Sequence, residues 1–359
     1  MNTKKIILGL FAAVLTFTSC SDDEGVNFQP VALGAYENGI IVNNEGNFLQ
    51  GNASTSFVSN DLSIVNNGIF TFHNNNAPLG DTAQSMAFYN NLAYIIVNGS
   101  NKVEIVNRYT FVKEAAINTG LEQPRYMTFA NGKGYITNWG DGADANDDYV
   151  AVIDLATNTI SSTIPVGEGP EQIVFSNGNL YISHKGGWGS NNIVTSIDVN
   201  SNAATTITLD NKPDEIVLDA ANNIWVLSEG DDLYDGSWNI IGRTTASLNK
   251  INTTTNVVDA TFVFATGVDP KTIAYDNGLI YFYANSKIYK LDETDTALPT
   301  TSIIDQELYQ GLAVKNGYIY GTTTNFTAGT GELVIYDAST YTLVDTKTLN
   351  VGSSKIYFN

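Results

Sequence analysis

Few residues in this sequence have the type and spacing that catalysis or metal binding requires. The chain has two histidines, His73 and His184, and one cysteine, Cys20, so it can form neither an internal disulfide nor a cluster of cysteine ligands. No Ser-His-Asp arrangement, Walker loop or Rossmann glycine pattern stands in a suitable context. The sequence therefore predicts a protein that is not an enzyme and that has no cofactor.

The acidic run at 141–148 is the segment that invites a metal interpretation. Asp144, Asn146 and Asp148 have the spacing of oxygen ligands in a calcium loop. However, Tyr149 stands where an EF-hand needs glycine, and Leu155 stands where the bidentate glutamate belongs. We predict a solvated acidic loop and no metal site, although the sequence leaves calcium binding open.

The N-terminal segment has the organisation of an export signal. Lys4 and Lys5 precede an apolar stretch over 6–17, which is too short to span a bilayer permanently. The sequence LTFTSC, which ends at Cys20, resembles a lipobox, and SDDEG over 21–25 resembles the acidic lipoprotein export signal of Bacteroidetes. We expect a signal peptide over 1–19 and a tether over 20–35 that is lipidated at Cys20. The protein is then a cell-surface-exposed outer-membrane lipoprotein, held to the membrane by its lipid alone.

The net charge argues against one class of partner. The chain carries a formal charge of −20, and removal of 1–19 takes away two lysines and no acid, which leaves −22. A field of this sign repels phosphate backbones. We interpret the charge as a solvated acidic surface and expect no nucleic acid partner.

One phrase recurs along the rest of the chain and predicts its fold. A proline or its substitute, a polar residue, an apolar triplet and an Asn-Gly turn precede an aromatic-rich strand, as in PRYMTFANGKGYITN from Pro124. Related phrases begin at Ala83, Pro170, Pro213, Pro270 and Tyr309. Asn-Gly is the strongest short hairpin signal, and a second pair of strands follows in most units. Each unit of about 40–55 residues therefore has the size of one four-stranded propeller blade.

The seventh unit is split between the two ends of the chain. Residues 353–359 match the first strand of a unit, and NGIIVNNEG from Asn38 matches the turn and the second strand. The third and fourth strands follow at 54–60 and 62–72. We predict an all-β fold over 36–359, a seven-bladed β-propeller closed by the C-terminal strand joining the N-terminal blade, which removes exposed sheet edges. The turn positions that count the blades are Asn38, Asn90, Asn131, Asn177, Asn222, Asn277 and Asn316.

Loop lengths predict that one face of this propeller carries the function. The turns after the first and third strands are short, whereas several connections from the second strand to the third are long, at 45–53, 139–148, 185–192, 229–246 and 323–330. Function tends to lie on long loops held by a rigid scaffold. Trp139, Trp188 and Trp238 fall in these loops and would supply rigid aromatic contact area, whereas Trp225 lies in a strand and is expected in the core.

Polar residues at the start of each first strand are expected to form a ring around the axis on the same face. They follow the proline or its substitute and are Gln84, Arg125, Glu171, Asp214, Lys271, Gln310 and Ser354. The ring either pairs internally and with water or forms a polar floor beneath a ligand, and the sequence leaves both open. Glu171 and Asp214 are the carboxylate pair to test for glycosidic chemistry. We predict these ligand-binding residues: Gln84, Arg125, Tyr126, Asn138, Trp139, Glu171, His184, Trp188, Asp214, Tyr234, Trp238, Arg243, Lys271 and Gln310.

Several phrases together resemble a known family. NGIIVNNEGNFLQGNAS, LGDTAQSMAFYNNLAYIIVNGSNKVEIVN, QPRYMTFANGKGYITNW and VGEGPEQIVFSNGNLYISH occur in this order over most of the chain. They resemble the surface propeller lipoproteins of Bacteroidetes, the BtuG-type cobalamin-capture proteins, and more distantly the YncE-like propellers. The resemblance implies that the protein holds cobalamin or another corrinoid on one propeller face and passes it to a TonB-dependent outer-membrane transporter.

The residues themselves are compatible with this function and leave two others open. The amides of a corrinoid suit Asn, Asp and Gln partners, and its bulky ring suits aromatic loops, but no residue is marked as a cobalt ligand. A glycan- or protein-binding surface module on the same scaffold is the alternative. An enzyme such as a lactonase is the third possibility. Arg125 and Lys271 argue against it, because lactonase propellers generally hold a metal ion in this channel.

Overall fold

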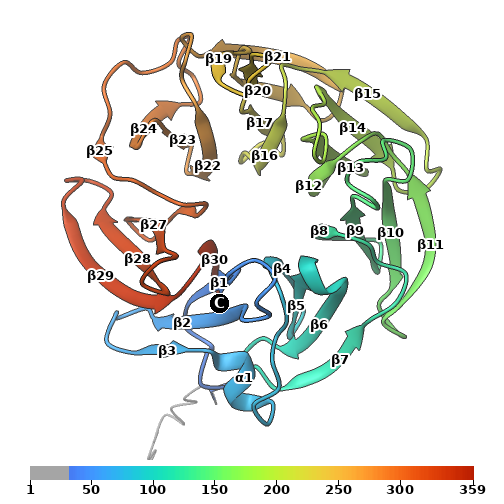
Figure 1. Ribbon diagram of the computed structural model, residues 1–359, viewed down its shortest axis with the longest axis vertical. Helices are drawn as coiled ribbons and strands as arrows, with labels where there is room; N and C mark the ends of the chain where they lie inside the picture. Colours follow the sequence, from blue (N-terminus) through green and yellow to red (C-terminus); the bar gives the residue numbers. More distant parts are fainter. Residues whose placement is uncertain (1–31) are drawn as a thin grey trace, which may run out of the picture. The chain divides into compact units, whose positions relative to one another are not determined.

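Seven four-stranded antiparallel sheets stand around a central axis in the computed structural model, so the predicted seven-bladed β-propeller is confirmed (Figure 1). The structure describes residues 32–359, of which Leu33–Asn359 form one compact unit. The predicted signal peptide, the lipidation site Cys20 and most of the predicted tether lie outside the described residues.

Each blade runs from an inner strand at the axis to an outer strand at the rim. We number the blades 1 to 6 from β4 onward and call the sheet built from both chain ends the closing blade, which stands last in each list below. The inner strands are β4 (Ala83–Tyr89), β8 (Pro124–Ala130), β12 (Pro170–Ser176), β16 (Pro213–Leu218), β22 (Pro270–Asp276), β26 (Leu312–Lys315) and β30 (Ser353–Phe358). The second strands are β5 (Leu92–Val97), β9 (Lys133–Asn138), β13 (Asn179–His184), β17 (Ile224–Ser228), β23 (Leu279–Ala284), β27 (Tyr318–Asn325) and β1 (Gly39–Asn44). The third strands are β6 (Lys102–Asn107), β10 (Tyr149–Asp154), β14 (Ile193–Asp198), β20 (Ser247–Asn252), β24 (Lys287–Asp292), β28 (Thr330–Asp337) and β2 (Ser54–Ser59). The outer strands are β7 (Lys113–Ile117), β11 (Thr159–Pro165), β15 (Ala204–Thr208), β21 (Val257–Val263), β25 (Ile304–Asp305), β29 (Leu343–Asn350) and β3 (Val65–Asn67).

The apolar core lies between neighbouring blades. The second strands read as nearly continuous apolar runs, such as LAYIIV in β5, because both of their faces are covered. Outer strands such as β21 alternate between more and less exposed positions, because one face meets water. Each cluster joins two sheets: Ile96 and Ile105 of blade 1 pack with Met127 and Ile136 of blade 2.

The two chain ends close the ring as predicted. β30 pairs antiparallel with β1, with Ile41 opposite Tyr357 and Asn44 opposite Ser353. The asparagines predicted at the turns of blades 1 to 6 all have positive φ, as a tight two-residue turn requires. Asn38 does not, so its assignment as a turn residue was wrong: no chain connects β30 to β1, and this turn is absent.

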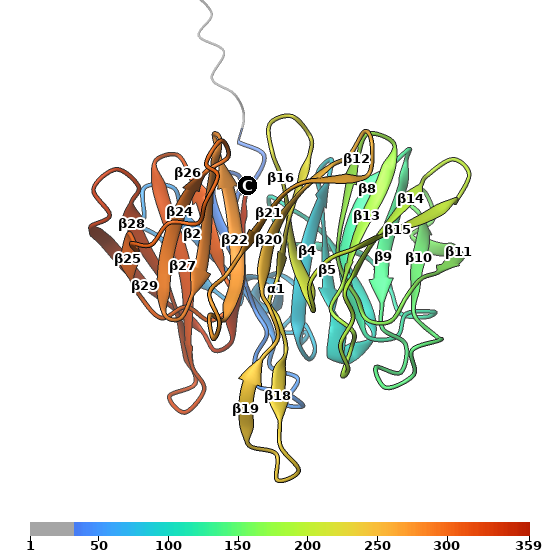
Figure 2. The same ribbon diagram turned by 90° about the horizontal axis from the view of Figure 1, so that it is seen from above.

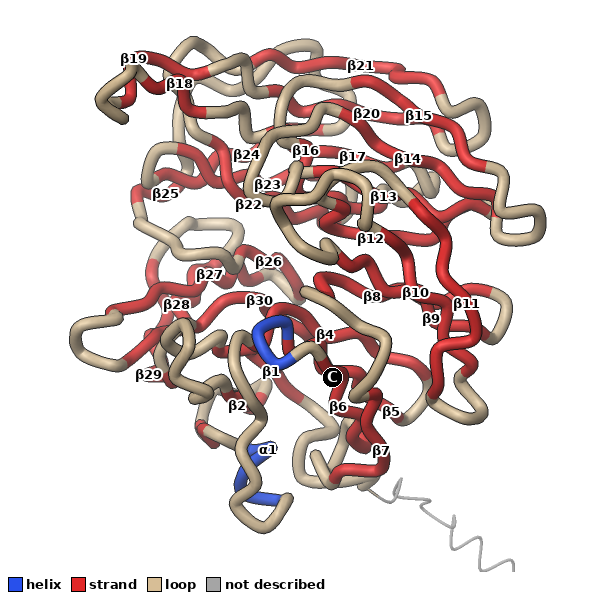
Figure 3. Tube along the Cα trace, turned by 45° about the vertical axis from the view of Figure 1, so that its right-hand side comes forward, coloured by secondary structure: helices blue, strands red, loops and turns tan. Residues whose placement is uncertain are grey.

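The predicted fourth strand of the closing blade, 62–72, needs a further correction. Only β3 is a strand, and the chain then forms a one-turn helix, α1 (Ile69–His73). Gly68 has φ +68°, which ends the strand. The adjacent side chains of Ile69 and Phe70 both enter the same core cluster, which a helical turn permits and a one-sided strand does not. Helical segments among the described residues are confined to α1 and the 3-10 turn η1 (Asn98–Ser100) (Figure 3).

The longest predicted loop, 229–246, contains a small hairpin of its own. It is formed by β18 (Asp232–Tyr234) and β19 (Ile240–Arg243) and projects from the face of the disc (Figure 2). Among the described residues, no helix is long and apolar enough to cross a membrane.

Loss of one hydrogen bond at the ring closure should measurably destabilise the fold. The Tyr357 hydroxyl of β30 accepts a hydrogen bond of 2.8 Å from the buried Met86 N–H of β4. Tyr357→Phe removes the acceptor, and we expect the free energy of unfolding to fall by about 1–3 kcal/mol in urea titrations. The control is Tyr109→Phe on a surface turn, which should change it little. Equal stability of the wild type and Tyr357→Phe would contradict this account of the closure.

Candidate functional site

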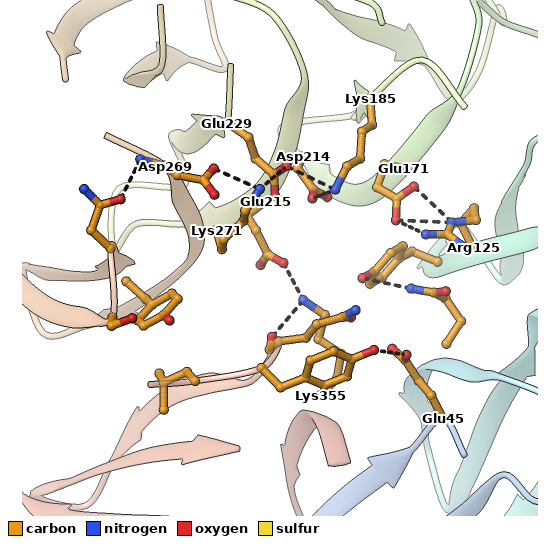
Figure 4. Close-up of a pocket in the computed structure, with 18 residues that line it drawn as sticks. Glu45, Arg125, Glu171, Lys185, Asp214, Glu215, Glu229, Asp269, Lys271 and Lys355 are labelled. Atoms are coloured by element: carbon orange, nitrogen blue, oxygen red, sulfur yellow. Dashed lines mark hydrogen bonds and ion pairs between the residues drawn. The ribbon is translucent and has the colours of Figure 1, made fainter. Parts of the chain in front are cut away.

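A cavity of about 600 Å³ opens at the axis, on the face that carries the long loops (Figure 4). Its walls come from the first residues of the inner strands and from the residues that follow the second strands. Seven of the fourteen predicted ligand-binding residues line this axial cavity: Gln84, Arg125, Tyr126, Glu171, Asp214, Lys271 and Gln310.

The seventh ring position differs from the prediction. Ser354 is buried, and its hydroxyl donates to the Asn43 carbonyl, while its own carbonyl accepts from Thr322. The next residue, Lys355, lines the cavity instead, as Tyr126 and Glu215 do at the equivalent place in blades 2 and 4. Ser354 bonds instead to the other chain end, a contact that the repeated phrase does not reveal.

One wall of the axial cavity is a buried arginine–carboxylate pair. Arg125 donates to both Glu171 oxygens, at 2.7–3.2 Å, and its guanidinium lies 4.0 Å from the centre of the Trp139 ring. Burial alone would lower the pKa of Arg125, but the Glu171 carboxylate raises it, so the charge is retained. The pair is a rigid wall of matched charge.

A second wall of the axial cavity consists of lysine and carboxylate side chains that alternate in charge. Lys185 contacts Asp214 at 2.5 Å and Glu229 at 3.3 Å, and Lys271 contacts Glu229 at 3.3 Å and Asp269 at 2.9 Å. Burial raises the pKa of Asp214, but Lys185 and Lys355 together outweigh burial and bring it to about 2. Burial raises the pKa of Glu229 to about 7. Asp214 therefore cannot act as a general acid at neutral pH, which argues against glycosidic chemistry by this pair.

An ion pair across the axis forms the floor. Lys355 of the closing blade donates to Glu215 of blade 4, from nearly opposite sides of the ring. Both residues also line a deeper cavity of about 200 Å³. Burial raises the pKa of Glu215. Burial alone would lower the pKa of Lys355, but the charge of Glu215 and neighbouring groups outweighs it and raises this pKa well above its ordinary value.

Glu45 differs from the other charged residues that line the axial cavity, because it has no ion-pair partner among the described residues. Its Oε2 accepts from the Tyr309 hydroxyl at 3.0 Å, and none of the ion pairs among the described residues includes it. Burial raises the pKa of Glu45. Its placement was missed from the sequence, as were Lys185, Glu229 and Asn285. All four directly follow a second strand, so aligning that position across the units would have found them.

Two predicted site residues are fully buried in structural contacts, and neither lines the axial cavity. Asn138 is fully buried, accepts from the Glu122 N–H and donates to the Ile136 carbonyl. His184 is fully buried between the Gly167 carbonyl and the Thr195 hydroxyl, and burial lowers its pKa to about 4. Both end second strands, and their polar atoms hold loops in place.

The three loop tryptophans do not form one exposed patch. Trp139 is only 8% exposed and donates from Nε1 to the Pro170 carbonyl. Its ring is therefore held in place and packs against the guanidinium of Arg125. Trp188 is 70% exposed, and its ring centre lies 6.1 Å from that of Trp139. Trp238 is 83% exposed at the tip of the β18–β19 hairpin, beside Tyr234. The tryptophans lie on one face, but only two are available to a partner.

Arg243 anchors the projecting hairpin to the edge of the axial cavity. It pairs with Asp232 across the hairpin and, at 2.7 Å, with Asp269 in the cavity lining. It does not line the cavity itself. Its predicted role as a ligand contact therefore has no direct geometric support, and its visible role is to orient the hairpin.

The acidic loop at 141–148 is organised by its own hydrogen bonds. The Asp141 N–H donates to Asp147, and the Asn146 N–H donates to Asp144. Asp148 is buried and accepts from the Gly169 N–H at 2.9 Å, and burial raises its pKa to about 7. Within the described part of the chain, no group of three or more His, Cys, Asp or Glu residues is placed to hold a metal ion.

Comparisons with known proteins bear on the fold and the family. A family model described as "Domain of unknown function (DUF5074)" matches residues 38–352, and no curated protein matches the chain. Among solved structures, the chain is similar to a "putative 6-phosphogluconolactonase" from Bacteroides fragilis, with 13% identity and a TM-score of 0.62 over 91% of this chain and 99% of that chain. It is also similar to the computationally designed Ika8 protein, with 9% identity and a TM-score of 0.54 over 91% and 86%. At these identities the likeness shows the fold alone.

Breaking the Arg125–Glu171 pair should cost far more stability than breaking an exposed pair. Glu171→Gln leaves the buried guanidinium without a counter-charge, and we expect a loss of about 3–5 kcal/mol in the free energy of unfolding. Asp305→Asn breaks the exposed pair with Lys287, which water screens, and should cost far less. Similar losses measured by urea denaturation would show that the wall of the cavity is not a buried ion pair.

The buried carboxyl of Asp148 should make stability depend on pH. The folded state holds this proton more tightly than the unfolded chain, so the wild type loses stability as pH rises from about 4 to about 7. Asp148→Asn cannot ionise and keeps an acceptor for the Gly169 N–H. Its stability relative to the wild type should rise by about 2 kcal/mol between pH 4 and pH 8, because water partly screens this carboxyl. A stability difference that is independent of pH would contradict the raised pKa.

Proposed function

The chain belongs to the DUF5074 family, and we propose that it is a non-catalytic module that captures a small-molecule ligand at its axial cavity. One observation carries the proposal: seven blades converge on a polar cavity of about 600 Å³ that opens on the face with the long loops. Small-molecule sites of proteins are concave and typically measure about 300–1,000 Å³. The cavity has the size and position of such a site.

The paired charges of the cavity favour a ligand rich in neutral hydrogen-bonding groups. Nine of its ten charged lining residues form ion pairs with one another or with Arg243; Glu45 is the exception. Six of the ten are carboxyl groups and four are cationic, so a ligand with a large negative charge would add to the excess negative charge in a site partly shielded from water, which is costly. Amides both donate and accept, so they can bind beside matched charges without disturbing them.

The ligand that we propose is a corrinoid such as cobalamin. The sequence resemblance to BtuG-type proteins supports this choice, and the amides at the corrinoid periphery fit the mixed donors and acceptors of the cavity. A corrinoid is larger than the cavity, so we place peripheral amides inside it and the ring across its mouth. Trp188, exposed beside the Trp139–Arg125 stack, supplies aromatic contact area at the rim.

We further propose that the protein is a surface lipoprotein that passes its ligand to a TonB-dependent transporter. The described N-terminal end is compatible with this proposal. Tyr36 packs in the core, and its N–H donates to the Tyr109 carbonyl in a turn between third and outer strands. Such turns lie on the face opposite the axial cavity, so Tyr36, near the start of the described chain, lies toward that face.

The β18–β19 hairpin favours protein binding as a second candidate function. It exposes Trp238, Ile240 and Ile241 by 60–83%, together with Leu233 and Tyr234 by nearly half. Exposed apolar side chains gathered on one projection are typical of protein contact sites. The two functions are compatible, because the hairpin and the axial cavity use different residues.

Calorimetric titration with cyanocobalamin tests the proposed function. We expect saturable binding by the wild type, weakened about 3- to 10-fold in Gln310→Ala, which removes one side-chain partner without breaking an ion pair. Trp188→Ala should weaken binding as well. The control Val112→Ala, on a turn of the opposite face, should bind like the wild type. No heat at micromolar wild-type protein would eliminate the proposed ligand, and equal effects of all three variants would contradict the choice of face.

A further inference from the structure

A second cavity, of about 490 Å³, lies between blades 4 and 5, and we call it the flank pocket. Its lining comes from the end of β21 and the loop after it, from β23 and β24, and from the loop that precedes β25. None of the lining residues is charged, whereas ten of the eighteen that line the axial cavity are. An uncharged concave surface stands out on a chain with a formal charge of −20.

The flank pocket exists because blade 5 lacks most of its outer strand. β25 has two residues, whereas the outer strands of the neighbouring blades, β21 and β29, have seven and eight. β25 pairs with β24 only at Lys287 and Ile288. The chain between β24 and β25 therefore runs as a loop, and Leu298 and Pro299 of this loop form one wall of the pocket.

The opposite wall of the flank pocket is aromatic and flat. Phe282 and Tyr289 stack with ring centres 5.1 Å apart and an angle of 10° between their planes. Phe264 meets Phe282 edge to face at 5.4 Å. Stacked and edge-to-face arrangements are the preferred contacts of aromatic rings, so a wall that contains aromatic side chains can make such contacts with a further flat ring.

The position of the flank pocket connects it with the proposed ligand site. Asn285 lines both the flank pocket and the axial cavity. Its side chain is fixed, because its Oδ1 accepts from the Asp269 N–H at 3.0 Å. A polar cavity and an apolar pocket therefore adjoin on one face of the propeller.

We propose that the flank pocket binds a flat, uncharged, fused aromatic ring. A ring that fits between the two walls gains dispersion contacts and removes apolar surface from water. The ring belongs either to a separate small molecule or to the ligand of the axial cavity. In the second case the inference rests on the proposed function and deepens it, because the ligand then has a polar part and an aromatic part.

A fluorescence titration with the uncharged probe N-phenyl-1-naphthylamine tests this site on the full chain. We expect a saturable increase in fluorescence with the wild type. Ala265→Trp places a large ring at the exposed rim of the pocket and should weaken binding about tenfold or more. Thr300→Phe fills the pocket from the opposite side and should act in the same direction, which keeps the test valid if one variant folds poorly. Ala328→Trp, on the exposed β27–β28 turn, is the matched control and should leave binding unchanged.

Three outcomes would overturn the flank pocket as a site. They are no saturable binding by the wild type, unchanged binding in both filled variants, and loss of binding in Trp238→Ser, which would locate the probe on the projecting hairpin. A competition titration with cyanocobalamin then shows which molecule carries the aromatic ring. Displacement of the probe by cyanocobalamin indicates one ligand with two parts, and retention indicates a separate small molecule. A wild type that binds the probe but not cyanocobalamin contradicts the proposed function and supports the flank pocket independently.

Discussion

The pairing of β30 with β1 is the constraint on which the rest of the structure depends. Without it, the closing blade would lack its inner strand, β1 would present an unpaired edge, and the ring of inner strands would be incomplete. Side-chain contacts add to the backbone hydrogen bonds between β30 and β1. The side chain of the last residue, Asn359, bonds to the backbone of Tyr36 and to Arg108, whose guanidinium lies 3.8 Å from the centre of the Phe88 ring. Residues far apart in sequence thus complete one sheet.

Closure of the ring determines the electrostatics of the axial cavity. Inner strands that begin at the same height bring their first polar side chains together around the axis, where water is partly excluded. Charges so placed are stable only when they are matched. The result is a set of pairs that connect different blades: Arg125 with Glu171, Lys185 with Asp214, and Lys355 with Glu215. This network leaves a cavity that can exchange hydrogen bonds with a ligand without a large change in charge.

The sequence predicted the architecture well and the site in part, for identifiable reasons. The repeated Asn-Gly turns and apolar triplets specify local strand pairs, so the blade count and the closure by 353–359 followed directly. Ring positions such as Arg125 and Lys271 could be predicted because they recur at a fixed place in each unit. The shift from Ser354 to Lys355 could not, because the Ser354 hydroxyl bonds to the Asn43 carbonyl near the other chain end, a contact that the repeated phrase does not contain. The burial of Trp139 likewise depends on a contact between blades, its hydrogen bond to the Pro170 carbonyl, which the sequence of a single unit does not contain.

The central claim is that the ligand lies over the axis on the face with the long loops. A structure of the protein soaked with cyanocobalamin tests this claim most directly. The account predicts ligand density over the axial cavity, with amides within hydrogen-bond distance of Gln310 or Gln84 and with the network of ion pairs intact. Density on the opposite face, or only on the β18–β19 hairpin away from the axis, would contradict it.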